Sequence, residues 1–412
     1  MPSLRRLFSS CFTGQKSSTT VVYGKSPSSA TTSDDGALEK KTADVDIKEP
    51  ETKPIPAPLS SSSPSPTSSP STYPPNKALV VAAKKTYALV PDIGYPTLEH
   101  ESEVIIQTQA VGLNPIDWKS VDYNFCLPEF PWITGREMAG VVVEVGKDVK
   151  DLKVGDRVWT STYYKSRRAG CFQTYVAVPA HTALPLPSNL TPEASACLGV
   201  AGLTAAMTLW NWLGVPMPTP TSPSTHSSPH SPFLLIWGGS AATGQFAIQL
   251  ATLAGLRVIA VTSAKTAHIA TALGAAHVVT RDERSNDDIV TAIREIAGDS
   301  ITRALDLVGS STAVACLRAV STTQPVLFAP LALMSKDVVV PGNVRVETVE
   351  MKRFVMDEGA RRFAEGLVRL VGDGKVRVPE IEVVEGGLEV VEGALERLKK
   401  GDLGGRKVVV RC

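Results

Sequence analysis

The residues from 233 to 261 constrain the fold of this chain more than any other segment. Phe233–Trp237 is a short, fully apolar run of the kind found in buried parallel strands. A glycine-rich stretch, 238–244, follows it directly, and then come an apolar helical stretch, 245–255, and a second strand, Arg257–Val261. Further strands are expected at 303–308 and 324–328. This alternation of strand and helix predicts an α/β protein with a doubly wound parallel sheet of the Rossmann type.

The turn after the first strand is a candidate ligand site. It matches the dinucleotide-binding pattern G-x-G-x-x-G, except that alanine stands at the middle glycine position. The first glycine makes the tight turn and the last lets helix and strand pack closely, while the added methyl group weakens the match. The helix N-terminus favours a pyrophosphate, and two hydroxyl groups add donors. The predicted binding residues are Gly239, Ser240, Ala241, Ala242, Thr243 and Gly244.

The end of the second strand distinguishes between the two nicotinamide cofactors. A NAD site has a carboxylate about 20 residues after the turn, where it binds the ribose 2′-hydroxyl. No Asp or Glu occurs from residue 238 to residue 281, and the strand ends instead in hydroxyl and cationic residues, which suit a 2′-phosphate. We therefore predict NADPH, with the alternative that these are ordinary loop residues. The predicted cofactor contacts here and on later strands are Ser263, Ala264, Lys265, Arg281, Val308, Gly309, Val408 and Val409.

The residues before this segment follow a different pattern. Short strands bounded by turn residues are expected at 104–111, 140–146, 155–159 and 172–178, which favours a barrel-like β domain. Thr191-Pro192-Glu193 then opens a helix that runs to about residue 213, with threonine as its N-cap. Residues 216–232 form a proline-rich insertion. Its His226 and His230 have a spacing that suits a metal on a helix, but the prolines forbid that helix.

The first 75 residues are too rich in Ser, Thr and Pro to form an apolar core, so we expect a disordered tail. Residues 1–33 contain no Asp or Glu but several Lys and Arg, a composition that also fits a mitochondrial transit peptide. The acids that begin at Asp34 favour a plain tail. The sequence therefore predicts a cytoplasmic protein, with mitochondrial import as the alternative.

The overall composition argues against several classes of function. The formal net charge is +1, so nothing indicates a nucleic acid or an anionic membrane surface as partner. No apolar run reaches the roughly 18 residues that a membrane-spanning helix needs. The 6 cysteines are scattered without a Cys-x-x-Cys pair, which is typical of reduced thiols.

Three motifs in the first half of the chain carry a resemblance to a known superfamily. They are GLNPIDWK at 112–119, GREMAGVV at 135–142 and VGDRV at 154–158. In this order they resemble the medium-chain dehydrogenases/reductases, in which a GroES-like β domain and a Rossmann domain enclose the active site. The resemblance implies a GroES-like β-barrel catalytic domain at 76–195, completed by 340–412, and a Rossmann domain at 196–339.

The zinc ligands of the alcohol dehydrogenases in this superfamily are missing from the sequence. Arg136 stands at the histidine of their Gly-His-Glu motif, Asn114 at their first cysteine, and Val200 or Ala201 near their third ligand. Zinc needs thiolate, imidazole or carboxylate donors, so we predict no metal site. Glu137 remains, and we expect it to form an ion pair with Arg136.

A narrower resemblance is to the fungal trans-acting enoyl reductases of polyketide pathways, which lie near the quinone oxidoreductases. Asn-Pro-x-Asp-x-Lys, the proline-rich insertion, the Gly-Gly-Ser turn and the closing Gly-Gly-Arg-Lys-Val-Val carry it. The resemblance implies that Thr204 lies near the nicotinamide and substrate. Lys119 is our first candidate for polarising the substrate, and Tyr123 is a weaker candidate for donating a proton. The resemblance also implies four residues that line the cofactor, namely Ile116, Asp117, Trp118 and Lys119.

Chemistry without a metal favours one class of reaction. Alcohol oxidation would lack a Lewis acid for the alkoxide, whereas an enone or enoyl thioester delocalises the incoming negative charge itself. We therefore expect hydride transfer from NADPH to the β carbon of an activated alkene, most of all an enoyl thioester of a polyketide synthase partner. Reduction of a quinone or small enone is the second hypothesis, and a non-enzymatic NADPH-binding sensor or scaffold is the third. The sequence leaves monomer and homodimer open.

Overall fold

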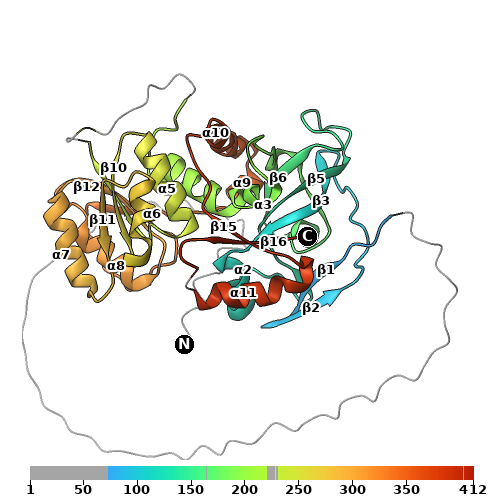
Figure 1. Ribbon diagram of the computed structural model, residues 1–412, viewed down its shortest axis with the longest axis horizontal. Helices are drawn as coiled ribbons and strands as arrows, with labels where there is room; N and C mark the ends of the chain where they lie inside the picture. Colours follow the sequence, from blue (N-terminus) through green and yellow to red (C-terminus); the bar gives the residue numbers. More distant parts are fainter. Residues whose placement is uncertain (1–72, 164, 220–227, 229–230, 402) are drawn as a thin grey trace, which may run out of the picture. The chain divides into compact units, whose positions relative to one another are not determined.

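The computed structural model describes residues 73–412 except 164, 220–227, 229–230 and 402. The predicted tail up to residue 72 lies outside the described residues, as do His226 and His230. Near the start of the described residues, the ring of Tyr73 stacks on that of Tyr95 with 4.5 Å between their centroids. Residues 73–412 form one compact unit, with a parallel sheet at one end and a mainly antiparallel sheet at the other (Figure 1).

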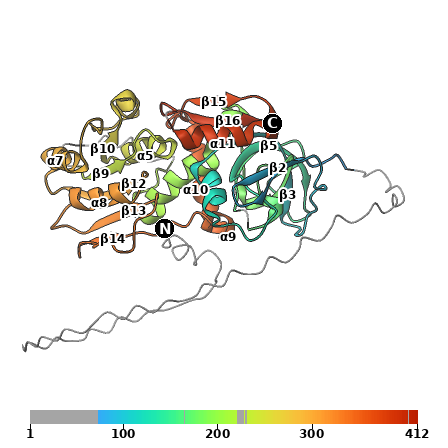
Figure 2. The ribbon, with the colours of Figure 1, turned by 90° about the horizontal axis from the view of Figure 1, so that it is seen from below.

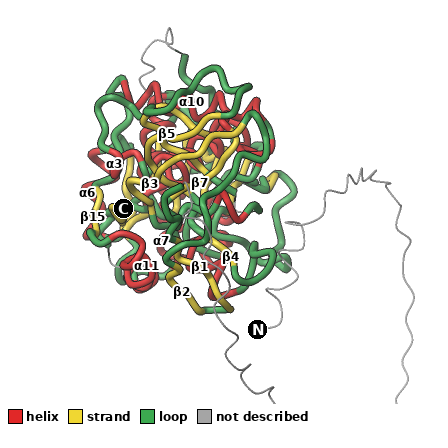
Figure 3. The backbone as a smooth tube through the Cα atoms, turned by 90° about the vertical axis from the view of Figure 1, so that its right-hand side faces the viewer, coloured by secondary structure: helices red, strands yellow, loops and turns green. Residues whose placement is uncertain are grey.

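The mainly antiparallel sheet contains the motifs from the first half of the chain. Its strands follow the order β15-β16-β3-β5-β6-β8, and β7 also pairs with β3. Figure 3 shows β5, β3 and β7 of this sheet together. A separate small sheet has the order β2-β1-β4. The bounds are β1 Ala78–Ala83, β2 Thr86–Val90, β3 Glu103–Gly112, β4 Trp132–Ile133, β5 Glu137–Val145, β6 Arg157–Ser161, β7 Tyr175–Pro179, β8 Ala183–Pro185, β15 Ile381–Val384 and β16 Lys407–Arg411.

β3 is the central strand of this sheet, and its side chains alternate between two apolar clusters. Val104 and Ile106 pack in the same cluster as Val142 of β5, whereas Ile105 packs with Tyr175 of β7 in another. This period of two is what an apolar strand covered on both faces requires. The sheet confirms the predicted GroES-like β domain. The strand expected at 172–178 begins later, at Tyr175, because the backbone of Phe172 bonds instead to Leu79 and Thr134.

The second sheet is parallel throughout and has the strand order β11-β10-β9-β12-β13-β14. Helices cover both of its faces (Figure 2), so it confirms the predicted Rossmann fold. The bounds are β9 Phe233–Trp237, α5 Ala242–Leu253, β10 Arg257–Thr262, α6 Ala267–Ala272, β11 His277–Thr280, α7 Asn286–Ala297, β12 Ile301–Asp306, α8 Ser310–Ala319, β13 Val326–Pro330 and β14 Val344–Val346.

The apolar run of β9 supplies both cores of this sheet. Leu234 and Ile236 pack in the core that includes α5, while Phe233, Leu235 and Trp237 pack in the core that includes α7 and α8. A strand at the centre of a parallel sheet is buried on both faces, which explains why no polar residue interrupts it. The cores on both faces fix β9 firmly, and the glycine turn that follows β9 starts from a fixed point.

The helix predicted from Thr191 to Leu213 spans Pro192–Trp212 in the structure. It comprises α3 Pro192–Ser195, α4 Leu203–Met207 and two π-helical stretches, Leu198–Gly202 and Thr208–Trp212. Thr191 caps it as predicted, with its hydroxyl accepting the N–H of Ala194. This helix is long and apolar enough to span a membrane. However, 78% of its apolar stretch is buried inside the protein, as in a core helix.

The last segment of the chain returns to the antiparallel sheet. After α9 Arg353–Met356, α10 Arg361–Gly372 and α11 Val391–Lys400, strand β16 pairs with β3. α11 packs on α2, Pro115–Tyr123, which follows β3. The final strand therefore lies beside the first motif of the chain. The domain boundaries at 195/196 and 339/340 stay predictions.

We expect Gly140→Ala to destabilise the protein by roughly 1–3 kcal/mol or more. A Cβ at residue 140 would lie 2.0 Å from the backbone oxygen of Gln107, because β5 crosses β3 closely at this point. The matched control is Gly393→Ala in α11, where nothing lies within 4 Å of the added methyl group. That variant should be more stable than wild type by roughly 0.5–1 kcal/mol. Chemical denaturation of both variants measures the difference, and equal stability of the two contradicts the packing argument.

Candidate cofactor and active site

A cleft of about 520 Å³ lies at the carboxyl end of the parallel sheet. The turn after β9 and the ends of β10 and β12 form one wall, and the loop before α2 and the segment from Leu403 to Val408 form the other. Ligands of open α/β sheets bind at this edge, where the strand order reverses. The volume lies within the usual range for a binding site of a small molecule or cofactor.

The glycine turn has the geometry that a phosphate group needs. Gly238 has a φ of +95°, which favours glycine. A Cβ on Gly244 would lie 2.4 Å from the carbonyl oxygen of Gly238, so helix α5 packs against its own turn only with glycine there. Ala241 stands at the N-cap of α5 and has no side-chain oxygen to accept a hydrogen bond. The first N–H groups of the helix therefore start at the cleft wall without a side-chain cap.

Two cationic side chains line the cleft beyond this turn. Lys265 follows β10 and Arg281 follows β11, and the parallel pairing of these strands brings their ends to the same edge. Ser263 lines the cleft as well, with its hydroxyl 2.9 Å from that of Thr266. These residues can bind an anion through charge-assisted hydrogen bonds.

The structure also brings a carboxylate to this end of the cleft. Oδ2 of Asp282 accepts the backbone N–H of Ala264 at 2.5 Å. The prediction of a stretch without acids after the glycine turn did not include Asp282, because this residue follows β11 and not β10. Only the expectation that adjacent parallel strands end side by side could have identified Asp282 from the sequence.

Buried polar groups support the part of the wall that follows β12. The carboxylate of Asp306 accepts hydrogen bonds from the hydroxyl of Thr312 at 2.6 Å and from the N–H of Gly309 at 3.1 Å. Burial raises the pKa of Asp306 to about 6. Leu307 and Val308 line the cleft, while the N–H of Gly309 donates to the buried carboxylate of Asp306. Gly309 therefore supports the wall rather than lining it.

A buried ion pair lies under the other wall. Nζ of Lys407 is 2.6 Å from Oε1 of Glu137, and their side chains are 4% and 0% exposed. The same ammonium donates to Oδ1 of Asn114 at 2.6 Å and to the carbonyl oxygen of Leu113 at 2.8 Å. Glu137 also accepts hydrogen bonds from the side-chain amide of Asn114 and from the N–H of Val200. All these partners make the pair a fully connected network.

This network contradicts the predicted ion pair between Glu137 and Arg136. Glu137 is the first residue of β5, and its two carboxylate oxygens bind Lys407, Asn114 and the N–H of Val200 instead. The guanidinium group of Arg136 lies instead 5.8 Å from the ring centroid of Tyr163. Among the residues that the structure describes, no three His, Cys, Asp or Glu side chains come together where they could hold a metal ion.

Helix α2 contains the motif that we expected at the cofactor. Asp117 is fully buried and accepts the N–H of Asn114 at 2.8 Å in a capping box. The ammonium of Lys119 lies 5.6 Å from the ring centroid of Trp118, and burial lowers the pKa of Lys119. Tyr123 is half exposed and packs against the same Trp118 ring. Most of helix α2 therefore lies outside the cleft and fixes the positions of Asn114 and Pro115, which line it.

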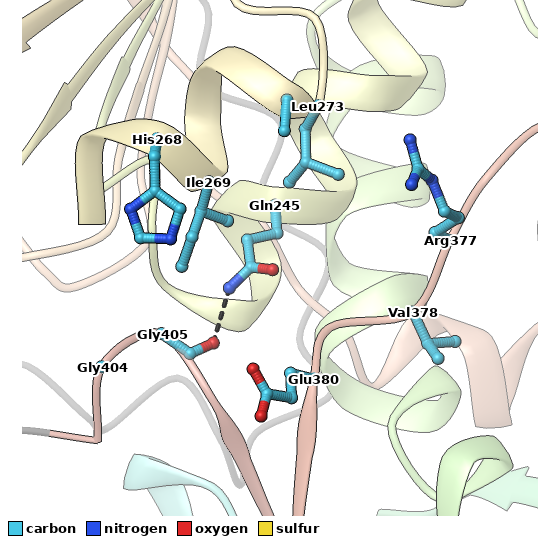
Figure 4. A pocket seen from close by; sticks show the side chains of 10 residues that line it. Gln245, His268, Ile269, Leu273, Arg377, Val378, Glu380, Gly404 and Gly405 are labelled. Atoms are coloured by element: carbon cyan, nitrogen blue, oxygen red, sulfur yellow. Dashed lines mark hydrogen bonds between the residues drawn. The ribbon is translucent and has the colours of Figure 1, made fainter.

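A polar contact joins the glycine turn to the opposite wall. The side-chain amide of Gln245 donates to the carbonyl oxygens of Gly405 at 2.6 Å and Ser240 at 2.9 Å. Figure 4 shows the bond to Gly405 beside a second, smaller pocket of about 250 Å³. Gln249, one turn further along α5, bonds to both backbone groups of Arg377. Helix α5 thus holds two separate parts of the C-terminal segment.

Nine of the predicted site residues line the cleft, and they come from five segments: Ser240, Ala241, Ala242, Thr243, Ser263, Lys265, Arg281, Val308 and Val408. The predicted residues that lie outside the lining are Ile116, Asp117, Trp118, Lys119, Tyr123, Thr204, Gly239, Gly244, Ala264, Gly309 and Val409. Their roles stay predictions. Sequence analysis missed most of the C-terminal wall, including Leu403, Gly404, Gly405, Arg406 and Lys407.

We expect Lys407→Met to destabilise the protein by roughly 3–5 kcal/mol, because Glu137 then keeps a buried charge without its cation. The double variant with Glu137→Gln should lose much less, since no buried charge remains. Chemical denaturation of the single and double variants measures the coupling. Lys77→Met is the control, since its pair with Glu389 is about half exposed and should be worth less than about 1 kcal/mol. Additive losses in the double variant contradict the proposed coupling.

We expect Asp117→Asn to flatten the dependence of stability on pH between about 4 and 7. Burial raises the pKa of Asp117 from 3.8 to about 7. The folded protein therefore holds a proton in this window that the unfolded chain has lost, and wild-type stability falls as the pH rises. The control is Asp288→Asn, the exposed capping-box acid of α7, whose pKa is lowered. This control should leave the window unchanged. Thermal unfolding at several pH values tests both, and identical pH profiles for wild type and Asp117→Asn contradict the assignment.

Comparison with known proteins agrees with this geometry. Residues 100–188 match the model of the alcohol dehydrogenase GroES-like domain, and residues 242–342 match that of the zinc-binding dehydrogenases. The dehydrogenase azaJ of Aspergillus niger is 32% identical, with 82% of this chain and 99% of azaJ covered. The trans-enoyl reductase caaB of the same species is 30% identical, with 81% of this chain and 99% of caaB covered.

A solved structure gives the same result for the fold. The structure of the mycobacterial protein Rv1454c complexed with NADPH superposes with a TM-score of 0.67 at 22% identity, covering 82% of this chain and 100% of that one. At this identity the likeness concerns the fold alone. AzaJ and caaB, at 32% and 30% identity, are matched over nearly their whole length. The two domain models occur in the same order as the two sheets. The chain therefore belongs to the medium-chain dehydrogenase/reductase superfamily of oxidoreductases.

Proposed function

We propose that this protein is an NADPH-dependent reductase that acts on an activated carbon–carbon double bond. The observation that carries the proposal is the cleft, in which the uncapped start of α5 and the side chains of Lys265 and Arg281 line one wall. Free N–H groups at a helix start suit a pyrophosphate, and the cations and the hydroxyl of Ser263 suit a 2′-phosphate. The residues present therefore fit NADPH.

The cleft also has an apolar part, which suits a hydride transfer because water is excluded from it. Leu113, Ala201 and Trp237 line it, and Asn114 contributes an amide that is tied on both sides into the Lys407–Glu137 network. When bound, NADPH supplies the hydride. The apolar side chains exclude water, and the network keeps the wall around Asn114 in one position, which favours a reproducible approach of substrate and cofactor.

For the substrate we propose an enoyl thioester on a carrier protein of a polyketide synthase. The likeness to trans-enoyl reductase caaB supports this choice, since the match covers nearly all of that protein. An enoyl thioester also stabilises the negative charge that a hydride brings, because the carbonyl group takes it up as an enolate. A quinone or a small enone is the alternative substrate, and it would need no carrier protein.

A substrate panel tests the proposal. The purified full chain is given NADPH with a 2-hexenoyl pantetheine thioester, a benzoquinone or 2-cyclohexenone, and the loss of NADPH absorbance is followed. We expect the highest kcat/KM for the thioester, and one deuterium at its β carbon when the hydride position of NADPH is deuterated. Turnover of the quinone alone supports the alternative. Tight NADPH binding without any turnover favours a sensor or scaffold, and stoichiometric zinc in the protein contradicts the metal-free site.

We expect Lys265→Met to raise the Kd for NADPH about tenfold and to leave the Kd for NADH within about twofold. The reason is that only the phosphorylated cofactor offers a group for the ammonium at the end of β10. Direct binding by nicotinamide fluorescence measures both values. Arg284→Met is the matched control, since Arg284 is an exposed cation of the loop after β11 that does not line the cleft. Equal weakening of both cofactors by Lys265→Met would falsify the assignment.

A further inference from the structure

We infer that Asp282 sets how strictly this site distinguishes NADPH from NADH. The inference rests on the proposed function and adds a specificity-determining residue to it. Asp282 lies outside the lining of the cleft, but its carboxylate places a negative charge beside the lining residues Ser263, Lys265 and Arg281. This charge opposes the 2′-phosphate of NADPH and has no such group to oppose in NADH.

The position of Asp282 follows from strand pairing. β10 and β11 are parallel, with Thr262 opposite Thr280, and the N–H of Arg281 donates to the carbonyl oxygen of Thr262 at 2.9 Å. The two strands therefore end side by side. The residues after β11 lie next to the turn after β10, which brings Asp282 to Ala264 although 18 residues separate them.

The contact itself lies between two cleft residues. Ala264, whose N–H binds Oδ2 of Asp282 at 2.5 Å, stands in the chain between Ser263 and Lys265, and both of these line the cleft. Arg281, the residue directly before Asp282, lines it as well. The carboxylate thus occupies a backbone donor that a phosphate on the ribose would otherwise be able to use.

Electrostatics give the direction and size of the effect. Two like charges about 5 Å apart in a solvent-exposed site repel each other enough to change an affinity about fivefold. The repulsion acts on NADPH alone, because NADH has no 2′-phosphate. In NAD sites a carboxylate at the ribose also accepts the 2′-hydroxyl, so the same group favours the unphosphorylated cofactor. We therefore expect wild type to prefer NADPH but to retain measurable affinity for NADH.

Asp282→Asn tests the inference by direct binding. The amide keeps an oxygen that accepts the N–H of Ala264 and loses the charge. Isothermal titration with NADP⁺ and NAD⁺ should show a Kd for NADP⁺ at least about fivefold lower than in wild type. The Kd for NAD⁺ should stay the same or rise. A ratio of the two Kd values that is unchanged, or that moves toward NAD⁺, overturns the inference.

Glu283→Gln is the matched control. It removes the same charge one residue further along the exposed loop, whereas the bond to the N–H of Ala264 belongs to Asp282. Its ratio of Kd values should stay within about twofold of wild type. An equal effect of both substitutions would mean a general charge effect and would also overturn the role of Asp282. Asp282→Ala removes charge and acceptor together, and it should shift the ratio in the same direction as Asp282→Asn.

The wild-type titration separates this inference from the proposed function. Wild type that binds neither nucleotide, or that prefers NAD⁺, contradicts both. Wild type that prefers NADP⁺, combined with an unchanged ratio in Asp282→Asn, overturns the role of Asp282 and leaves the proposed function standing. Thermal unfolding of each variant shows whether the fold is kept, and Asp282 is exposed, so we expect unchanged melting temperatures.

Discussion

The buried ammonium group of Lys407 is the interaction on which the active-site half of the protein depends. It lies at the start of the last strand and binds the carbonyl oxygen of Leu113, a residue 294 positions earlier in the chain. A buried charge is tolerated only when it has an opposite charge and enough hydrogen-bond partners. Glu137 and Asn114 meet this requirement, and by doing so they fix the last strand against the first motif. One wall of the cleft exists because of this network.

The opposite wall has a different physical origin. Strands of a parallel sheet all end at the same edge, so the residues that follow β9, β10, β11 and β12 are brought together whatever their distance in sequence. The glycine turn, Lys265, Arg281 and Val308 meet there for this reason alone. Gln245 then connects this wall to the loop at Gly405, so the two halves of the cleft share a direct polar contact in addition to their apolar packing.

The residues that were predicted well share one property, namely that their role follows from local geometry. The turn at 240–243 lies in the cleft because an apolar strand, a glycine turn and a helix form a unit within about 25 residues. Lys265 was found because it closely follows a predicted strand, and Arg281 because it is the next cation in a stretch without Asp or Glu. Lys119 was carried over by resemblance, and its side chain lies over Trp118, outside the lining of the cleft. Arg136 was paired with Glu137 only because the two are adjacent in sequence, whereas in the structure Glu137 pairs with Lys407.

Alternation of strand and helix, the apolar run of β9 and the glycine pattern were enough to predict the parallel sheet and a turn that lines the cleft. The GroES-like domain was predicted by resemblance. These features act over short stretches, where backbone geometry and burial dictate the residue type. The tertiary structure alone decided which partner each charged group meets. Lys407 with Glu137, and Asp282 with Ala264, come together through strand pairing across 270 and 18 residues, and no local pattern encodes such a pairing. The charge balance of the site is therefore a property of the folded chain.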